Sequence, residues 1–450
     1  MQNHFPPSDE EFWARVAAEG APLVDPDPDD PAYRLVTFVH RDGPADDPSD
    51  AVLALVHTVT DKDRHAGDLA PHLMRRRSGG WSHTYRLRAD HRASYQLYPV
   101  RGAVPGTARA DWLRVLDGAR PDPLARGARL PARDGRRPSS VFSLPDAPAQ
   151  PYAQRRADVP RGRTVTAEVA GRRVDVHLPA GTGAGTGADA APLPVLVLLD
   201  GEMWGEVLAV GDTLDNLAAD GVIPPTAALL VHTMGPGRPE DLSCNPDFVD
   251  LLADRLLPWA AAEHGTALAP DRTVVAGQSA GGLTAAFAAF RRPDRFGNAL
   301  CQSGSFWWPD GTEFDAGSEW LTRQFAAEQR RAARFWVEVG LQEWMLLTQN
   351  RHLRDVLVAR GYDVAYHEFN GGHDYACWRG GLADGLIHLL GSPAREVRPP
   401  APDAAKGGGR PPRRRVGRHP SRGRVDPWFV GDRQLVCVDE VTGDVTPTKG

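Results

Sequence analysis

Cysteine is scarce in this chain of 450 residues. Four cysteines are too few for a disulfide scaffold, and no two are spaced as CxxC, which excludes the usual zinc and redox motifs. We expect them to be free or buried thiols in a reducing compartment. They are Cys244, Cys301, Cys377 and Cys437.

Long hydrophobic runs are absent as well. No stretch approaches the roughly 18 apolar residues of a membrane span. Residues 1–16, MQNHFPPSDEEFWARV, lack the basic start and the apolar middle of a secretory signal. We therefore expect a soluble, cytoplasmic protein that makes no contact with a membrane.

Lysine is nearly missing, so arginine carries almost all of the positive charge. The 52 basic residues stand against 58 acidic ones, a formal net charge of −6. This balance argues against a protein that binds nucleic acid through bulk charge, although it allows a local basic pocket. The lysines are Lys62, Lys406 and Lys449.

The length predicts two or three domains, at roughly 100–200 residues each. Residues 1–150 carry short apolar runs near period 2, bounded by Asp, Gly and Pro, which predict a small β-sandwich. The proline-rich segment 139–152 is interpreted as an extended linker. The expected strands are 33–41, 51–59, 81–89 and 93–100.

Residues 151–395 alternate strand-like and helical patterns, which predicts an α/β domain with a mostly parallel sheet. LPVLVLLD (193–200) is apolar throughout, as expected of a central strand covered on both faces. The glycine-rich segment 181–190 has no lysine and no strand leading into it, so we interpret it as a flexible loop rather than a phosphate-binding one. The expected strands are 172–179, 193–200, 226–234, 272–279, 299–305, 334–340 and 363–369, and the expected helices are 246–263, 281–291, 317–332, 345–360 and 380–390.

Residues 396–450 differ again. Eight basic residues lie between Lys406 and Arg424 with almost nothing apolar around them, so this tail is predicted to be disordered and solvated. Residues 428–445 could form a hairpin, to which we assign no function.

The strongest chemical signal is a GxSxG motif, Gly277–Gly281, which follows an apolar strand and precedes a helix of small residues. A nucleophile at a sharp strand-to-helix turn sits in a strained backbone, so its neighbours must be small. The helix that begins there directs N–H groups at developing negative charge. Ser279 is therefore the candidate nucleophile.

A serine nucleophile needs a base, and in an α/β-hydrolase the base follows the serine and the acid in the chain. His352 and His388 lie in helical patterns, His367 lies in a strand, and His419 is in the basic tail. Only His373 lies in a loop after the last strand with a helix behind it, which makes it the candidate base.

The acid should follow the strand 334–340, where Glu343 is placed to orient His373. Glu338 lies within the strand and Asp374 is adjacent to the base, so both are poorer candidates; without Glu343 the enzyme would work largely as a Ser–His pair. The oxyanion hole needs two N–H donors, and we expect Ala280 to supply one. The loop Asp200–Trp204, with Glu202, should supply the other.

These motifs resemble the enterochelin esterase family. The resemblance covers about residues 8–395 and implies a β-sandwich domain, which shapes the substrate site, before an α/β-hydrolase. It implies that the protein hydrolyses the trilactone of ferric tris-catecholate siderophores such as enterobactin and releases iron in the cytoplasm. Ser279 and His373 match the family's nucleophile and base, and Glu343 fits its acid. The resemblance rests on AGQSAGG (276–282), 292–308, 371–382, LLDGEMW (198–204), 238–248, Trp81–Pro99 and 144–151.

The substrate that this resemblance implies is a multiply charged anion with aromatic rings. Its pocket needs cations even on an acidic protein, and arginines in loops or at a helix start beside the candidate catalytic residues could supply them. Tryptophans in the same motifs could stack on catechol rings. The candidate substrate-binding residues are Arg238, Arg379, Trp204, Trp307, Trp308 and Trp378.

Two other functions fit the same residues. A carboxylesterase or acyltransferase of this fold could act on a different ester. A non-catalytic protein could bind a siderophore or a glycan through the N-terminal domain, but the Ser279, His373 and Glu343 set argues against it. We expect no cofactor and no resident metal, with ferric iron entering only as part of the substrate. The sequence leaves the oligomeric state open.

Overall fold

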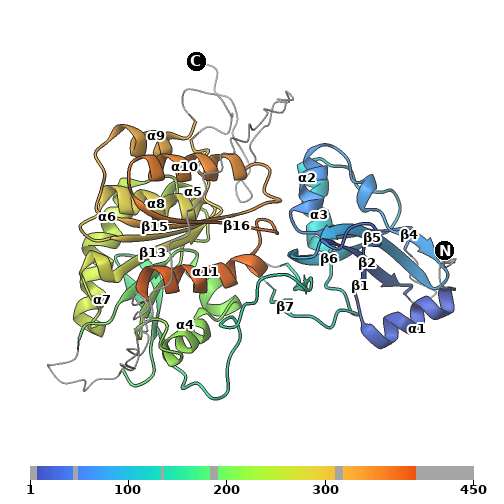
Figure 1. Cartoon of the computed structure of the whole chain (residues 1–450), viewed down its shortest axis with the longest axis horizontal. Helices are drawn as coiled ribbons and strands as arrows, with labels where there is room; N and C mark the ends of the chain where they lie inside the picture. Colours follow the sequence, from blue (N-terminus) through green and yellow to red (C-terminus); the bar gives the residue numbers. More distant parts are fainter. Residues whose placement is uncertain (1–7, 44–48, 133–135, 183–190, 310–317, 392–450) are drawn as a thin grey trace, which may run out of the picture.

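The computed structural model describes residues 8–43, 49–132, 136–182, 191–309 and 318–391. They form a β-rich N-terminal domain and a larger α/β domain, which lie side by side and are joined by residues 144–162 (Figure 1). This confirms the predicted fold class. The predicted boundary at 150/151 falls within the connection. The predicted tail 396–450 and its hairpin lie outside the described residues.

An eight-stranded sheet forms the centre of the α/β domain, in the order β16-β15-β14-β13-β11-β12-β10-β9. The strands from β11 to β16 pair in parallel, whereas β10 runs antiparallel to both β12 and β9. Every residue of β11 and β13 is buried, as the apolar sequence predicts for central strands. The strands are β9 Arg163–Val169, β10 Arg172–Leu178, β11 Val195–Leu198, β12 Ala227–Val231, β13 Thr273–Gln278, β14 Asn298–Gln302, β15 Arg334–Gly340 and β16 Asp363–Phe369.

Helices cover both faces of this sheet and bury two separate apolar cores. One core packs against α4 Val210–Ala219 and α11 Tyr375–Leu390, together with the π-helical turn Met203–Val207. The other packs against the helices that follow β12, β13, β14 and β15. These are α6 Pro246–Leu251, the π-helical turn Leu252–Leu256, α7 Leu257–His264, α8 Ala280–Arg291, α9 Trp320–Ala327 and α10 Leu347–Ala359, with the short α5 Arg238–Asp241 before them.

The N-terminal domain is a sandwich of two four-stranded sheets, in the orders β1-β2-β5-β4 and β3-β6-β8-β7. Both sheets contribute to one core, in which Phe38 of β2 contacts Tyr95 of β6 and Phe142 of β8. The strands are β1 Leu23–Pro26, β2 Tyr33–Arg41, β3 Ala51–Val56, β4 Arg75–Arg77, β5 Gly80–Arg88, β6 Arg92–Val100, β7 Arg129–Leu130 and β8 Ser139–Ser143. The helices are α1 Asp9–Glu19, α2 Val59–His65 and α3 Arg109–Gly118.

The structure corrects several local predictions. Residues 139–143 are not linker but strand β8, because the strand pairs with β6 and Phe142 completes the sandwich core. The expected strand 51–59 ends at Val56, and α2 begins at Val59. Helix α1 was missed although Ser8 and Glu11 form a capping box at its start, which is a readable sequence signal.

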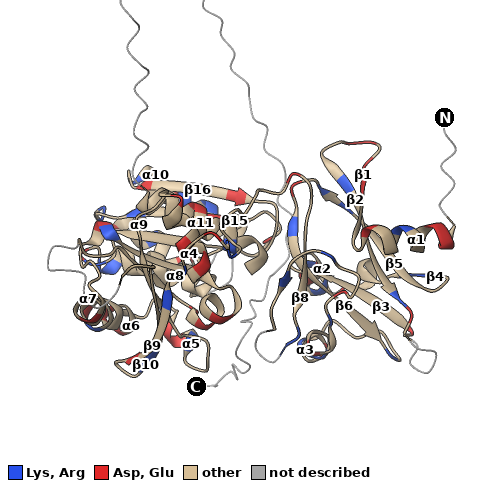
Figure 2. Cartoon of the chain, turned by 90° about the horizontal axis from the view of Figure 1, so that it is seen from below, with Lys and Arg blue, Asp and Glu red and all other residues tan. Residues whose placement is uncertain are grey.

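Three further observations bear on the sequence-based expectations. The cysteines Cys244, Cys301 and Cys377 are free and buried, as predicted. Within the described ranges no helix combines the length and the hydrophobicity needed to cross a bilayer. Basic and acidic residues are interspersed along the elements of both domains (Figure 2).

Candidate active site

The candidate nucleophile sits at a strained turn. Ser279 joins β13 to α8 with φ 57° and ψ −122°, a left-handed backbone conformation that a non-glycine residue adopts only when its surroundings enforce it. A Cβ atom on Gly277 would lie 2.4 Å from the backbone of Gly281, so the turn closes only with glycine there. The GxSxG motif is thus a steric requirement of the turn. Ser279 is half-buried, and Ala280 opens α8.

The candidate base and acid contact each other directly. His373 donates from Nδ1 to Oε2 of Glu343 at 2.7 Å, which fixes the tautomer that leaves Nε2 as the basic nitrogen. Glu343 is only 2% exposed. Its Oε1 accepts from the backbone N–H of Gly340 at 2.8 Å and from the hydroxyl of Ser303 at 2.6 Å. These bonds hold the carboxylate in one orientation.

The two competing acids are engaged elsewhere. Asp374 caps α11 by accepting from Ala376 N–H, and its other oxygen accepts from the backbone of Ser94. Glu338 is buried beneath the site, where it accepts from Gln302 Nε2 at 2.6 Å and from Trp336 Nε1 at 3.1 Å. Burial raises the pKa of Glu338 to about 7, and the nearby carboxyls of Asp384 and Glu343 add to that rise.

The segment after β14 connects the nucleophile to the acid. Ser303 contacts Glu343, and two residues later Ser305 Oγ lies 3.3 Å from Ser279 Oγ. The backbone N–H of Ser305 also donates to the carbonyl of Ser279 at 3.0 Å. Ser303 and Ser305 are buried, so this segment connects the ends of β13, β14 and β15 in one cluster. No group of three or more His, Cys, Asp or Glu side chains in the described ranges gathers as a metal site.

Comparison with known proteins identifies the family of this chain. The family described as "Enterochelin esterase, N-terminal" matches residues 35–153, and the family described as "Putative esterase" matches residues 170–389. An iron(III) enterobactin esterase of Dickeya dadantii is 31% identical over 85% of this chain and 93% of its own. The chain belongs to the enterochelin esterase family. It is a carboxylic ester hydrolase.

Other members of the enterochelin esterase family are also similar to this chain, in sequence and in structure. An iron(III) enterobactin esterase of Escherichia coli K12 is 32% identical, over 79% of this chain and 90% of its own. The crystal structure of the enterobactin esterase from Shigella flexneri, in the presence of enterobactin, matches with a TM-score of 0.71. That match has 29% identity and covers 86% of this chain and 99% of the other. The similarity therefore includes both domains.

The predicted oxyanion loop of this esterase is held by buried charges. Asp200, at φ 53° and 1% exposed, accepts two hydrogen bonds from Arg238, at 2.9 and 2.8 Å. The carboxylate of Glu202 accepts from the backbone N–H groups of Thr233 and Met234, and burial raises its pKa. Arg238 thus pairs with the loop, and its binding of the substrate stays a prediction. Oxyanion donation by the N–H groups of Ala280 and Glu202 stays a prediction.

Two of the four predicted stacking tryptophans belong to the core of the esterase, which corrects the prediction that they stack on catechol rings. Trp204 is 1% exposed and donates to Gln278, and Trp378 is 3% exposed and donates to Ser303. Neither indole face is open to a catechol; the Trp378 ring instead packs edge-on against His373 at 4.7 Å between centroids. Trp307 and Trp308 are half-buried just after Ser305, so stacking by these two stays a prediction.

The N-terminal domain of the esterase contacts the histidine loop, which the sequence analysis did not foresee. Thr58 Oγ1 accepts from the backbone N–H of His373 at 2.9 Å, and His57 Nε2 donates to its carbonyl at 2.7 Å. Asp90 Oδ1 accepts from Asn370 Nδ2 at 2.7 Å on the same loop. Thr58 and His373 are 315 residues apart, and no local sequence signal joins them. The domain therefore positions the candidate base in addition to flanking the site.

Proposed function

We propose that this chain hydrolyses the ester bonds of ferric catecholate siderophores such as enterobactin, with Ser279 as nucleophile, His373 as general base and Glu343 as the acid that orients it. The observation that carries the proposal is the 2.7 Å bond from His373 Nδ1 to the buried Glu343, which Ser303 and Ser305 connect to the strained serine turn. The names of the relatives, iron(III) enterobactin esterases, support the substrate class.

The arrangement supports an acyl-enzyme mechanism. Ser279 Oγ attacks the ester carbonyl while His373 Nε2 takes its proton, and the carboxylate of Glu343 stabilises the imidazolium that results. The backbone N–H groups of Ala280 and Glu202 stabilise the oxyanion. Collapse of this intermediate expels the alcohol, which takes the proton from His373. Water, deprotonated by the same ring, then releases the acid from Ser279.

The iron is cargo rather than a cofactor in this proposal. A trilactone holds three catechols on one ring, so opening the ring removes the preorganisation that makes the ferric complex tight. Hydrolysis would thereby loosen the iron, which we propose happens in the cytoplasm. Trp307 and Trp308 are the proposed aromatic contacts for the catechols, and Arg379 is the proposed cation.

The test is mass spectrometry of ferric enterobactin after incubation with the purified protein. The wild type should yield ring-opened and shorter chains, and Ser279→Ala should lower the rate by on the order of 10⁶-fold. Ser82→Ala is the matched control, because its hydroxyl contacts Arg77 and not the candidate triad. Cleavage of p-nitrophenyl acetate without any cleavage of ferric enterobactin would instead identify a carboxylesterase for other substrates.

A further inference from the structure

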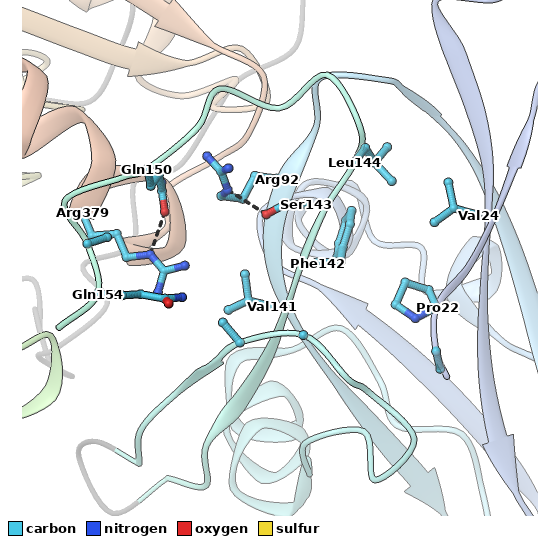
Figure 3. A pocket seen from close by; sticks show the side chains of 14 residues that line it. Pro22, Val24, Arg92, Val141, Phe142, Ser143, Leu144, Gln150, Gln154 and Arg379 are labelled. Atoms are coloured by element: carbon cyan, nitrogen blue, oxygen red, sulfur yellow. Dashed lines mark hydrogen bonds between the residues drawn. The ribbon is translucent and has the colours of Figure 1, made fainter. Parts of the chain in front are cut away.

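A cavity of about 430 Å³ lies where the two domains meet (Figure 3). Its wall comes from β1 and β8 of the N-terminal domain, from Gln150 and Gln154 of the connection, and from Arg379 of α11. None of the three candidate catalytic residues lines it. Its size is within the roughly 300–1,000 Å³ of small-molecule sites, which favour domain interfaces.

Two arginines from different domains reach this cavity (Figure 3). Arg92 donates to Ser143 Oγ at 2.8 Å and to the carbonyl of Pro148 at 2.6 Å. Arg379 donates from Nε to Gln150 Oε1 at 2.8 Å. All of these acceptors are neutral. Among the ion pairs of the described residues, no carboxylate pairs with Arg92 or with Arg379.

Three other partly buried arginines among the described residues are neutralised by carboxylates. Arg238 pairs with Asp200, Arg172 with Asp241, and Arg292 with Asp254. Burial lowers the pKa of both Arg92 and Arg379, and for Arg92 the charge of Arg379 adds to that effect. Two like charges are therefore held in one partly desolvated cavity, an arrangement that an anion between them would stabilise.

The rest of the wall limits what such an anion can be. Val24, Phe142 and Leu144 line the side away from Arg379, and Val141 lies between them and Arg379 (Figure 3). An inorganic anion would leave these apolar groups uncovered, whereas a carboxylate on an apolar or aromatic body would contact both sides.

We propose that this cavity binds a small organic anion, with its carboxylate between Arg92 and Arg379 and its apolar body against Phe142. The natural source of that chemistry rests on the proposed function. Each ester that the enzyme hydrolyses yields one carboxylate on an aryl-amide unit, so the acid product of the reaction fits the cavity.

Binding of N-benzoyl-serine, measured by calorimetry, tests the cavity without needing turnover. The Ser279→Ala protein should bind this acid more tightly than its neutral amide. Adding Arg92→Gln or Arg379→Gln should weaken acid binding roughly 10- to 100-fold and leave amide binding unchanged. Arg379→Lys, which keeps the charge, should recover part of the loss. Arg75→Gln, at an exposed position of β4, is the matched control and should change nothing.

Each outcome decides between the alternatives. Equal binding of acid and amide, or an affinity that neither arginine changes in variants with a normal melting temperature, would overturn the site. Inorganic phosphate that competes as well as benzoyl-serine would overturn the organic part of the ligand. If the acid binds as expected but the wild type does not cleave ferric enterobactin, the cavity stands, and it is the proposed function that fails.

Discussion

Thr58 Oγ1 accepts a hydrogen bond from the backbone N–H of His373 at 2.9 Å, across the boundary between the two domains. The contact constrains the backbone of both segments. Thr58 adopts a positive φ of 69°, and a Cβ atom on Gly372 would lie only 2.0 Å from the threonine hydroxyl. His57 donates to the carbonyl of the same histidine. Both backbone groups of the candidate base therefore find their partners in the N-terminal domain.

We predict that Thr58→Val lowers kcat on the order of 10-fold. Valine keeps the shape of the side chain but leaves the backbone N–H of His373 without its acceptor. This destabilises the loop that holds the imidazole of His373 by about 1–3 kcal/mol of free energy. The loss should affect p-nitrophenyl acetate as well as ferric enterobactin, with little change in KM. Thr58→Ser keeps the hydroxyl and should restore the rate. A kcat for Thr58→Val equal to that of the wild type would show that the loop holds itself.

The parts of the site that could be predicted from sequence are those fixed by local backbone geometry. Ser279 is recognisable because a strained turn requires small neighbours at Gly277 and Gly281. His373 and Glu343 follow strands whose carboxyl ends must meet at one edge of a parallel sheet, so their places in the chain were sufficient to predict their contact. The alternation of strands and helices predicted the fold for the same reason.

The parts that could not be predicted depend on contacts between distant segments. A tryptophan in a motif suits packing and stacking equally well, so only the fold shows that Trp204 and Trp378 are buried. Arg238 looked free because its partner, Asp200, lies on another strand end. The proline-rich composition of 139–152 hid strand β8, whose identity depends on pairing with β6.

The identity of the acid gives a second prediction. Glu343→Gln should lower kcat by roughly 10³- to 10⁴-fold, because an amide can donate to Nδ1 and favour the wrong tautomer of His373. Rates on p-nitrophenyl acetate and circular dichroism of the same samples measure the effect against intact folding. Glu338→Gln is the control, since that carboxyl contacts Gln302 and Trp336 instead of the base. A loss of kcat of the same size in Glu338→Gln would show that the buried hydrogen bonds of Glu338 with Gln302 and Trp336 matter as much as Glu343.

A third prediction concerns Arg238. Arg238→Gln leaves the buried carboxylate of Asp200 unpaired and should lower the free energy of unfolding by about 3–5 kcal/mol. Because the oxyanion loop is disturbed, kcat should fall alike on ferric and on neutral esters. The double variant Asp200→Asn/Arg238→Gln should recover most of the stability in urea unfolding. A loss of kcat on the ferric substrate alone, with a normal free energy of unfolding, would show that Arg238 recognises the substrate and does not support the loop.

The buried Glu338 predicts a specific pH dependence of stability. Its folded-state pKa of about 7 lies above the ordinary value of 4.5, so the folded protein favours the protonated form. The stability from this group is fully present below about pH 4.5 and is lost as the pH rises through about 7, a change on the order of 3 kcal/mol.

Glu338→Gln cannot ionise and should not show this loss. Urea unfolding of both proteins at pH 5 and pH 8 isolates the effect, since all other carboxyls are shared. The free energy of unfolding of the wild type should fall relative to the variant by about 2–3 kcal/mol over that range, and a difference that stays constant would mean that Glu338 is ionised in the folded protein throughout.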